Sequence, residues 1–304
     1  MARRTTTTTQ QQTARFGRIT LPVFDPPQHP DFVPGPEEFI DPYGYAERIA
    51  FAWERNWDVA LLGPTGVGKT SLVRYMCHET GRAYRRFPCQ EATDTAALIG
   101  KPWLVVDQDS GKQEMLWQRG IAYDAVYEEH VLLLDEWNLA HPDVQMALNP
   151  LFRVDEGMLI VPENEGEIVP RGEHFRLVCT GNPTTYAGVK AWNPAVLSRF
   201  DLVIWMDYLP ENDEVRLLVN QTGVEEQVAR CMVKAAGACR EAVNDNTLRF
   251  PFSYRELSNW CDALDTFGIR EGAEISVVGK AEQDDQEPVR ELLRAAFPDA
   301  LWNS

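Results

Sequence analysis

One stretch decides the fold of this 304-residue chain: Asp58-Val59-Ala60-Leu61-Leu62-Gly63-Pro64-Thr65-Gly66-Val67-Gly68-Lys69-Thr70-Ser71. Residues 59–62 are a short apolar run of the length expected for a buried strand. Residues 63–70 fit the phosphate-loop pattern G-x-x-x-x-G-K-[ST] without a mismatch. Beyond the loop, Leu72, Val73, Met76 and Cys77 recur at helical spacing. The stretch therefore predicts a strand, a glycine loop and a helix, in that order.

This order of elements is the context that the loop motif needs. Its glycines let backbone N–H groups curl round an anion, and the helix N-terminus adds a partial positive charge. Lys69 is expected to reach the β- and γ-phosphates of a nucleotide, and the Thr70 hydroxyl to ligate Mg²⁺. A glycine-rich turn that binds nothing is disfavoured, because Gly-Lys-Thr at this spacing serves no obvious packing purpose. The residues predicted to hold the nucleotide are Gly63, Pro64, Thr65, Gly66, Val67, Gly68, Lys69, Thr70 and Ser71.

A second signal is the run Val131-Leu132-Leu133-Leu134 followed by Asp135 and Glu136. The two carboxylates come at the C-terminal end of a predicted strand, where ligands of parallel sheets bind. Asp135 is expected to hold the Mg²⁺ shell, directly or through water, and Glu136 to polarise the attacking water. Such a run is common by itself, and it becomes informative when it follows a matching phosphate loop.

A third buried strand, over residues 175–180, ends in Gly181-Asn182-Pro183. An amide at that point can orient the lytic water against the γ-phosphate. The local sequence leaves open that Asn182 is simply a turn residue before proline.

Composition limits the class of protein. A hydrophobic content of 44% is ordinary for a soluble protein with a core, and the length suits one large domain or two smaller ones. The net charge of −17 argues against a protein that coats nucleic acid, since phosphate binding needs clustered Lys and Arg. The six cysteines are scattered without a C-x-x-C pair, as expected of reduced thiols. No apolar run approaches the roughly 18 residues of a membrane span, so we expect a soluble, cytoplasmic protein with no membrane partner.

The order of elements predicts the fold class. Strands and helices alternate up to about Pro210, and only helices follow, which indicates a parallel α/β domain and then a small α-helical lid domain. Two β-hairpins are inserted, Trp103–Trp117 around Asp109-Ser110-Gly111 and a second over residues 158–169. The predicted organisation is a disordered tail and proline-rich strap (1–36), a nucleotide-binding domain (37–209), the lid (210–270), and an acidic linker with a C-terminal helix (271–304).

A helix is also expected before the phosphate loop, within residues 37–57. Such a helix often covers the base of the nucleotide, so Ile40, Tyr43 or Tyr45 could pack on adenine. Plain core packing is the favoured alternative.

With these pieces placed, the chain resembles the AAA+ ATPases over about residues 37–267, and within them the MoxR-type branch. It looks most like the small AAA+ subunit of aerobic cobaltochelatase and its stand-alone relatives. The more selective pieces are Gly100-Lys101 before the first hairpin, residues 175–183, Leu197-Ser198-Arg199-Phe200-Asp201 and Tyr208-Leu209-Pro210. The chain departs from the cobaltochelatase subunit in its N-terminal region and in its helical region after Arg255.

The resemblance implies roles for particular residues. Residues 63–70 match the Walker A loop, Asp135-Glu136 the Walker B motif, and Asn182 the sensor-1 position. Arg199 falls where related rings place an arginine finger that enters the neighbouring subunit's site; the alternative is a surface arginine that caps a helix C-terminus. Arg255 matches the sensor-2 arginine of the lid. Arg153 is a reserve candidate for a cation at the subunit interface.

The function that the resemblance implies is a Mg²⁺-dependent ATPase that forms a ring, expected to be a hexamer, and uses ATP to remodel or activate a partner protein. The partner is expected to carry a von Willebrand factor A-type domain or to be a chelatase large subunit. Two alternatives stay open: a nucleic-acid motor such as a helicase loader, and a nucleotide-gated scaffold that does not hydrolyse ATP.

Overall fold

The computed structural model describes residues 12–106, 112–182, 192–250 and 252–302. The chain divides into two compact units. The first is made of Met1–Leu61, Thr70–Gly181 and Trp192–Ile204, and the second of Leu62–Lys69, Asn182–Ala191 and Trp205–Ser304. In the described part of the chain, no helix has the length and apolar character needed to cross a membrane.

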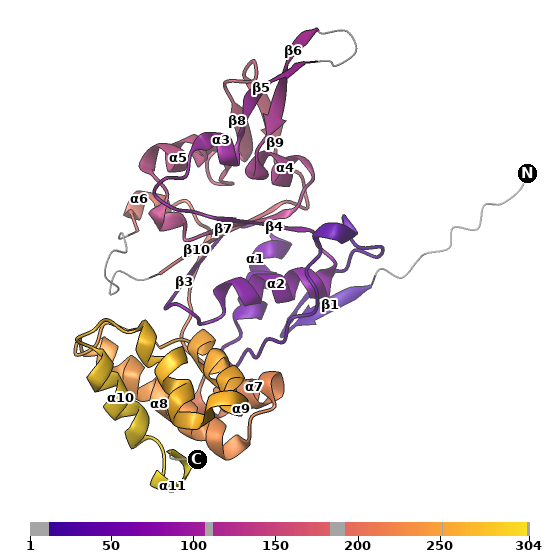
Figure 1. Ribbon diagram of the computed structural model, residues 1–304. Helices are drawn as coiled ribbons and strands as arrows, with labels where there is room; N and C mark the ends of the chain where they lie inside the picture. The colour runs from indigo at the N-terminus through magenta and orange to yellow at the C-terminus, as the bar shows by residue number, and fades with distance from the viewer. Residues whose placement is uncertain (1–11, 107–111, 183–191, 251, 303–304) are drawn as a thin grey trace, which may run out of the picture. The chain divides into compact units, whose positions relative to one another are not determined.

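Five of the strands form one sheet (Figure 1). Its strand order is β11 (Leu202–Trp205), β3 (Val59–Leu62), β10 (Arg176–Gly181), β7 (Val131–Asp135) and β4 (Tyr84–Pro88). β10 and β4 both pair with β7 in parallel. Every residue of β3, β10 and β7 is buried, because these inner strands are covered on both faces. The sheet and the parallel α/β class are as the sequence predicts.

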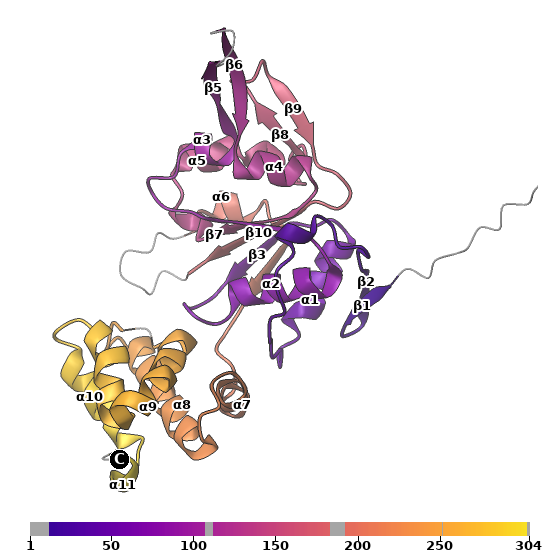
Figure 2. The same cartoon turned by 45° about the vertical axis from the view of Figure 1, so that its right-hand side comes forward.

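Among the described residues, the α-helices that accompany the sheet are α1 (Tyr45–Glu54), α2 (Lys69–Thr80), α3 (Thr95–Leu98), α4 (Ile121–Tyr127), α5 (Pro142–Ala147) and α6 (Pro194–Leu197). Figures 1 and 2 show α1 and α2 on one face and α4 and α5 on the other. Their starts follow local chemistry. The Asp41 carboxylate accepts from the backbone N–H groups of Tyr45 and Ala46, which caps α1. Asn193 caps α6 in the same way, and Pro142 occupies the first turn of α5.

The N-terminal region corrects one expectation. The sequence predicts a disordered tail and a proline-rich strap over residues 1–36, but β1 (Thr13–Phe16) and β2 (Ile19–Pro22) form an antiparallel hairpin in contact with α1. Phe16 and Leu21 are buried, and Gly17 makes the turn with a positive φ of 58°. The apolar alternation of this short stretch is hidden beside a long threonine and glutamine run. Residues 1–11 lie outside the described residues.

Both predicted hairpin inserts are confirmed. The first joins β5 (Gly100–Val106) to β6 (Gln113–Arg119) with Trp103 opposite Leu116, and its predicted turn at Asp109-Ser110-Gly111 lies outside the described residues. The second joins β8 (Met158–Val161) to β9 (Glu167–Pro170). The two hairpins stand side by side in both views, beyond the α4 and α5 face of the sheet (Figures 1 and 2).

The second unit contains the helices α7 (Glu211–Thr222), α8 (Glu226–Asn244), α9 (Tyr254–Ser276), α10 (Gln286–Ala295) and α11 (Asp299–Trp302). They share a core of their own, with Met232, Phe252 and Trp260 fully buried. α9 continues to Ser276 past a kink at Gly268, where φ is 69°. The Trp260 indole N–H donates to the Ile269 carbonyl at 2.9 Å and so bridges the kink. This contact joins residues nine positions apart, so the spacing of apolar residues in the sequence does not reveal it.

Candidate nucleotide site

The phosphate loop connects β3 to α2, and its backbone requires glycine. Gly63, Gly66 and Gly68 have φ values of 155°, 78° and 89°, all in the region that other residues rarely adopt. Space is also restricted within the second unit. A Cβ on Gly66 would lie 2.3 Å from the Ser253 Cβ, and one on Gly63 would lie 2.3 Å from the Met206 carbonyl oxygen. The glycines at 63 and 66 are therefore fixed by close contacts as well as by conformation.

Lys69 lies within the curve of this loop and is only 8% exposed. Its ammonium donates to the carbonyl oxygens of Gly63 and Pro64, each at 2.7 Å, and to the Asn182 side-chain oxygen at 2.9 Å. Three oxygens thus hold the charge of a nearly buried lysine. The structure brings together Lys69 and Asn182, 113 residues apart, which are the residues predicted for the phosphate loop and the sensor-1 position.

Two further residues of the second unit support the loop, and sequence reasoning missed both. The Tyr208 hydroxyl donates to the Thr65 carbonyl at 3.2 Å. The Arg240 guanidinium lies over the Tyr208 ring, 3.9 Å from its centroid, and forms two hydrogen bonds of 2.7 Å to the Glu214 carboxylate. In the sequence, the Tyr-Leu-Pro run at 208–210 is used only as part of the family resemblance, although this run was the available signal for the Tyr208 contact.

The acidic end of β7 lies in the first unit together with Thr70. The Thr70 hydroxyl is 3.5 Å from Asp135 Oδ2, and the Thr180 hydroxyl donates to Asp135 Oδ1. Thr180 also accepts from the Glu136 backbone N–H at 3.0 Å. A hydroxyl and a carboxylate oxygen at this separation are the hard oxygen donors that Mg²⁺ takes in proteins, so Thr70 and Asp135 fit the predicted metal site.

Glu136 differs from Asp135 in both exposure and backbone. Asp135 is 7% exposed, whereas Glu136 is exposed and has a positive φ of 55°. Non-glycine residues in this conformation are uncommon and are concentrated at functional sites. The pair therefore offers one fixed carboxylate and one that faces solvent.

Arg86 is a functional candidate that sequence reasoning missed. Pairing of β4 with β7 places Arg86 opposite Leu133, and its side chain reaches along the strand to Asp135, where Nε donates to Oδ2 at 2.9 Å. Burial opposes its charge, but the hydrogen bond to Asp135 and the negative charge of Glu136 raise the pKa of Arg86 overall. A basic residue in the strand beside an Asp-Glu strand was the available signal.

The candidate trans-acting arginines lie together in the first unit. Arg199 Nε donates to Asp155 Oδ2 at 3.0 Å, and Nη1 donates to the Ala195 carbonyl. Arg153 Nε donates to Asp201 Oδ2 at 3.1 Å, and Nη2 donates to Asp201 Oδ1.

Arg255 lies instead in the first turn of α9, in the second unit. It follows Ser253, the N-cap residue that adjoins Gly66. The Arg255 backbone N–H donates to the Ser253 hydroxyl at 3.3 Å, whereas its side chain is exposed and, within the described part of the chain, makes no hydrogen bond.

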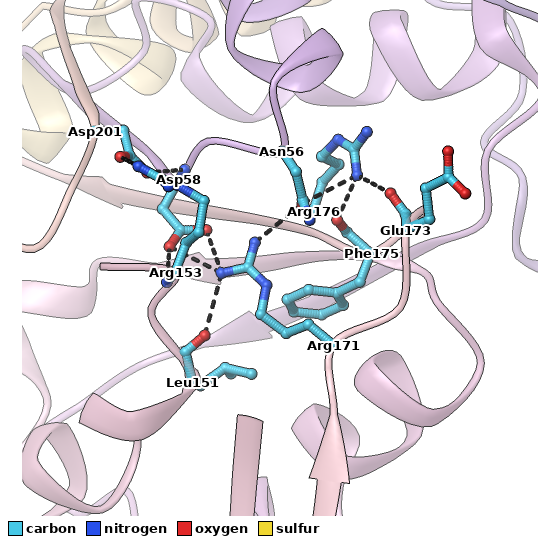
Figure 3. Close-up of polar contacts among 9 residues, drawn as sticks. All are labelled: Asn56, Asp58, Leu151, Arg153, Arg171, Glu173, Phe175, Arg176 and Asp201. Atoms are coloured by element: carbon cyan, nitrogen blue, oxygen red, sulfur yellow. Dashed lines mark hydrogen bonds and ion pairs between the residues drawn. The ribbon is translucent and has the colours of Figure 1, made fainter. Parts of the chain in front are cut away.

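Behind the arginines lies a buried polar network (Figure 3). Asp58 is fully buried, and its Oδ2 accepts from Arg171 Nη1 at 2.9 Å and from the Arg153 backbone N–H at 2.8 Å. Its own N–H donates to Asp201 Oδ2 at 3.0 Å. Burial raises the pKa of the Asp58 carboxyl, and the charge of Arg171 opposes that shift. Burial and the neighbouring arginines lower the pKa of Arg176 to about 9. None of this network was predicted.

The adenine contact stays a prediction. Of the two described tyrosines proposed for it, Tyr45 is buried in α1 and Tyr43 is 39% exposed, with their rings 5.3 Å apart. Both alternatives, base contact and core packing, remain open for this pair.

Residues 58–200 match the family model of the AAA domain (dynein-related subfamily). The denitrification regulatory protein NirQ of Stutzerimonas stutzeri is 30% identical over 203 residues, which cover 66% of this chain and 70% of that protein. NirQ of Pseudomonas aeruginosa is 31% identical over 189 residues, or 62% and 69% of the two chains. Midasin of Dictyostelium discoideum is 34% identical over 180 residues, 59% of this chain but 3% of that protein. Fold, loop and relatives agree: the chain belongs to the AAA+ ATPases of the dynein-related AAA domain family, together with the NirQ proteins.

Proposed function

We propose that this chain is a ring-forming, Mg²⁺-dependent ATPase that uses ATP hydrolysis to remodel a partner protein. The observation that carries the proposal is the position of Lys69, whose ammonium is held by two loop carbonyls and by Asn182. Lys69 is also the first residue of α2, and the N-terminus of a helix favours an anion. Its ammonium therefore lies where a phosphate group is expected to bind.

The residues then divide the chemistry of hydrolysis among them. Lys69 neutralises phosphate charge, and Thr70 with Asp135 would hold the metal, which would supply charge stabilisation to the phosphates. Glu136 takes the proton of the attacking water, and Asn182 orients that water. Arg199 enters the site of the neighbouring subunit, and Arg255 responds to the γ-phosphate from the first turn of α9. Support for these roles comes from the oxygen donors at Asp135 and from the exposed, positive-φ backbone of Glu136.

Binding and turnover are separated by two variants. Lys69→Ala is expected to lose ATP binding, measured with a fluorescent nucleotide. Glu136→Gln is expected to bind ATP normally while turnover falls about a hundredfold or more, since a general base contributes that much. Unchanged turnover in Glu136→Gln would sink the hydrolase proposal and favour the nucleotide-gated scaffold.

The first hairpin supports the partner-remodelling part of the proposal. Trp103, Leu104 and Met115 are 53%, 50% and 64% exposed, and they lie on both faces of the β5–β6 ribbon. Exposed apolar surface of this kind marks protein contacts. A von Willebrand factor A-type domain or a chelatase large subunit is the partner we propose to test first. Pull-down of such a protein by the wild-type chain, and its loss with Trp103→Ser plus Met115→Ser, is the expected result; equal capture by both chains would refute the role of the hairpin.

The nucleic-acid motor is the weaker proposal because the net charge is −17. ATPase stimulation by single- or double-stranded DNA is the measurement that would revive it.

A further inference from the structure

Two short segments of the first unit are joined by a pair of reciprocal ion pairs. Arg153-Val154-Asp155 lies beside Arg199-Phe200-Asp201, with Arg153 bound to Asp201 and Arg199 bound to Asp155. Between them, the rings of Phe152 and Phe200 meet edge to face at 5.1 Å. The two segments therefore contact one another through charge on both sides of an aromatic contact.

The first of these segments belongs to the foot of the β8–β9 hairpin. Asp155 lies three residues before β8, and the Arg171 backbone N–H, just after β9, donates to the Gly157 carbonyl at 3.0 Å. Arg171 also binds buried Asp58 and donates to the Leu151 carbonyl at 3.1 Å (Figure 3). The Arg153 backbone N–H, on the other side of the hairpin, also donates to Asp58. Both ends of the hairpin are therefore fixed to this one buried carboxylate, which holds the segment that carries Asp155 in place.

The two arginines are bound in different ways. Asp201 engages Arg153 through Nε and Nη2, so both carboxylate oxygens face the guanidinium fork. Asp155 and the Ala195 carbonyl engage Arg199 through Nε and Nη1 instead. Among the residues that the structure describes, the terminal Nη2 of Arg199 has no hydrogen-bond partner. Arg153 is therefore bound as a structural cation, while Arg199 is held from one side with its tip left for another anion.

We infer that Asp155, at the foot of the β8–β9 hairpin, is a positioning residue for Arg199, so that the hairpin and the arginine that serves the neighbouring subunit move together. This inference rests on the proposed function, in which Arg199 acts in trans. A displacement of the hairpin then moves Arg199 in the neighbouring active site through the Asp155 carboxylate. The Arg199 and Asp155 side chains are 26% and 35% exposed, so their pair contributes little to folding stability, and its effect is on orientation.

The experiment uses mixed assemblies of full-length chains. Lys69→Ala subunits lack a competent nucleotide loop but keep Arg199, and Arg199→Ala subunits keep the loop but lack the arginine. If Arg199 acts in trans, mixing the two restores ATPase activity that neither has alone. Asp155→Asn is then added to one member of the mixture at a time.

Asp155→Asn in the Lys69→Ala subunit is expected to lower the restored activity about tenfold, since the arginine it donates is no longer oriented. The same change in the Arg199→Ala subunit is expected to have no effect, because no arginine is present there to position. Asp155→Glu in the Lys69→Ala subunit is expected to recover part of the activity. Glu156→Gln is the matched control, being an adjacent exposed carboxylate that makes no ion pair within the described residues.

An effect in the Lys69→Ala subunit alone distinguishes a positioning role of Asp155 from a general loss of folding. Misfolding caused by Asp155→Asn would lower the activity of the mixture whichever subunit carried it. Equal effects in both subunits, or none in either, overturn the inference and leave the trans arginine standing. No restored activity in the starting mixture overturns the proposed trans role of Arg199, and the inference falls with it.

Discussion

The ion pair between Asp58 and Arg171 makes the sharpest stability prediction. The Asp58 side chain is fully buried and that of Arg171 is 3% exposed, with 2.8 Å between them. Asp58→Asn keeps the shape but removes the charge, which leaves a buried guanidinium without its counter-ion. Breaking one partner of such a pair costs about 3–5 kcal/mol. The free energy of unfolding of the Asn variant should fall by that amount.

The double variant Asp58→Asn with Arg171→Met tests the reason for the loss. Because it removes both charges, the unfolding free energy should return most of the way to wild type. Urea denaturation of all three chains at equal concentration measures the difference. Glu54→Gln is the control, since Glu54 and Arg55 pair on the surface with 49% and 41% exposure, and its effect should stay below about 1 kcal/mol. A loss below about 1 kcal/mol in Asp58→Asn would refute the stabilising role of the pair, as would an equal loss in the double variant.

Three further predictions concern the candidate site and its support. Arg86→Gln should lower the Mg²⁺ concentration needed for nucleotide binding about fivefold, because the variant removes from Asp135 a half-exposed cation whose interaction is worth about 1 kcal/mol. A Mg²⁺ titration with a fluorescent nucleotide checks this prediction. An unchanged or higher Mg²⁺ requirement would contradict it. Burial lowers the pKa of His130 from 6.5 to about 4, so stability present above pH 6.5 should be lost as pH falls towards 4, by about 2 kcal/mol after solvent screening; His130→Gln should flatten that dependence in urea melts at pH 7 and pH 4.5. Gly66→Ala should abolish ATP binding, because its Cβ would lie 2.3 Å from that of Ser253; ordinary binding by the purified variant would show that the loop can shift.

Sequence reasoning recovered the parts of this molecule that depend on local pattern. The strand, loop and helix around Lys69, the acidic end of β7 and both hairpins follow from apolar periodicity and turn chemistry within short windows. The family relationship to AAA+ ATPases followed from those motifs, and the relatives agree with it.

The parts that escaped prediction depend on contacts between distant residues. Arg86 reaches Asp135 across 49 positions, and Arg171 reaches Asp58 across 113. A charged residue gives no local sign that it will be buried against a partner, because the same residue on a surface looks identical in sequence. The cobaltochelatase likeness concerns a partner protein, and it stays a prediction.

The ribbon formed by β5 and β6 has a consequence for handling the protein in solution. Trp103 and Leu116 occupy one face and Leu104 and Met115 the other, and their exposed fractions run from 47% to 64%. A two-stranded ribbon keeps two unpaired strand edges, and apolar residues beside such edges favour pairing with another chain. We therefore expect this hairpin to lower the colloidal stability of the chain, which light scattering against concentration measures. Shielding it with a bound protein should keep the chain dispersed at concentrations where the free chain clusters.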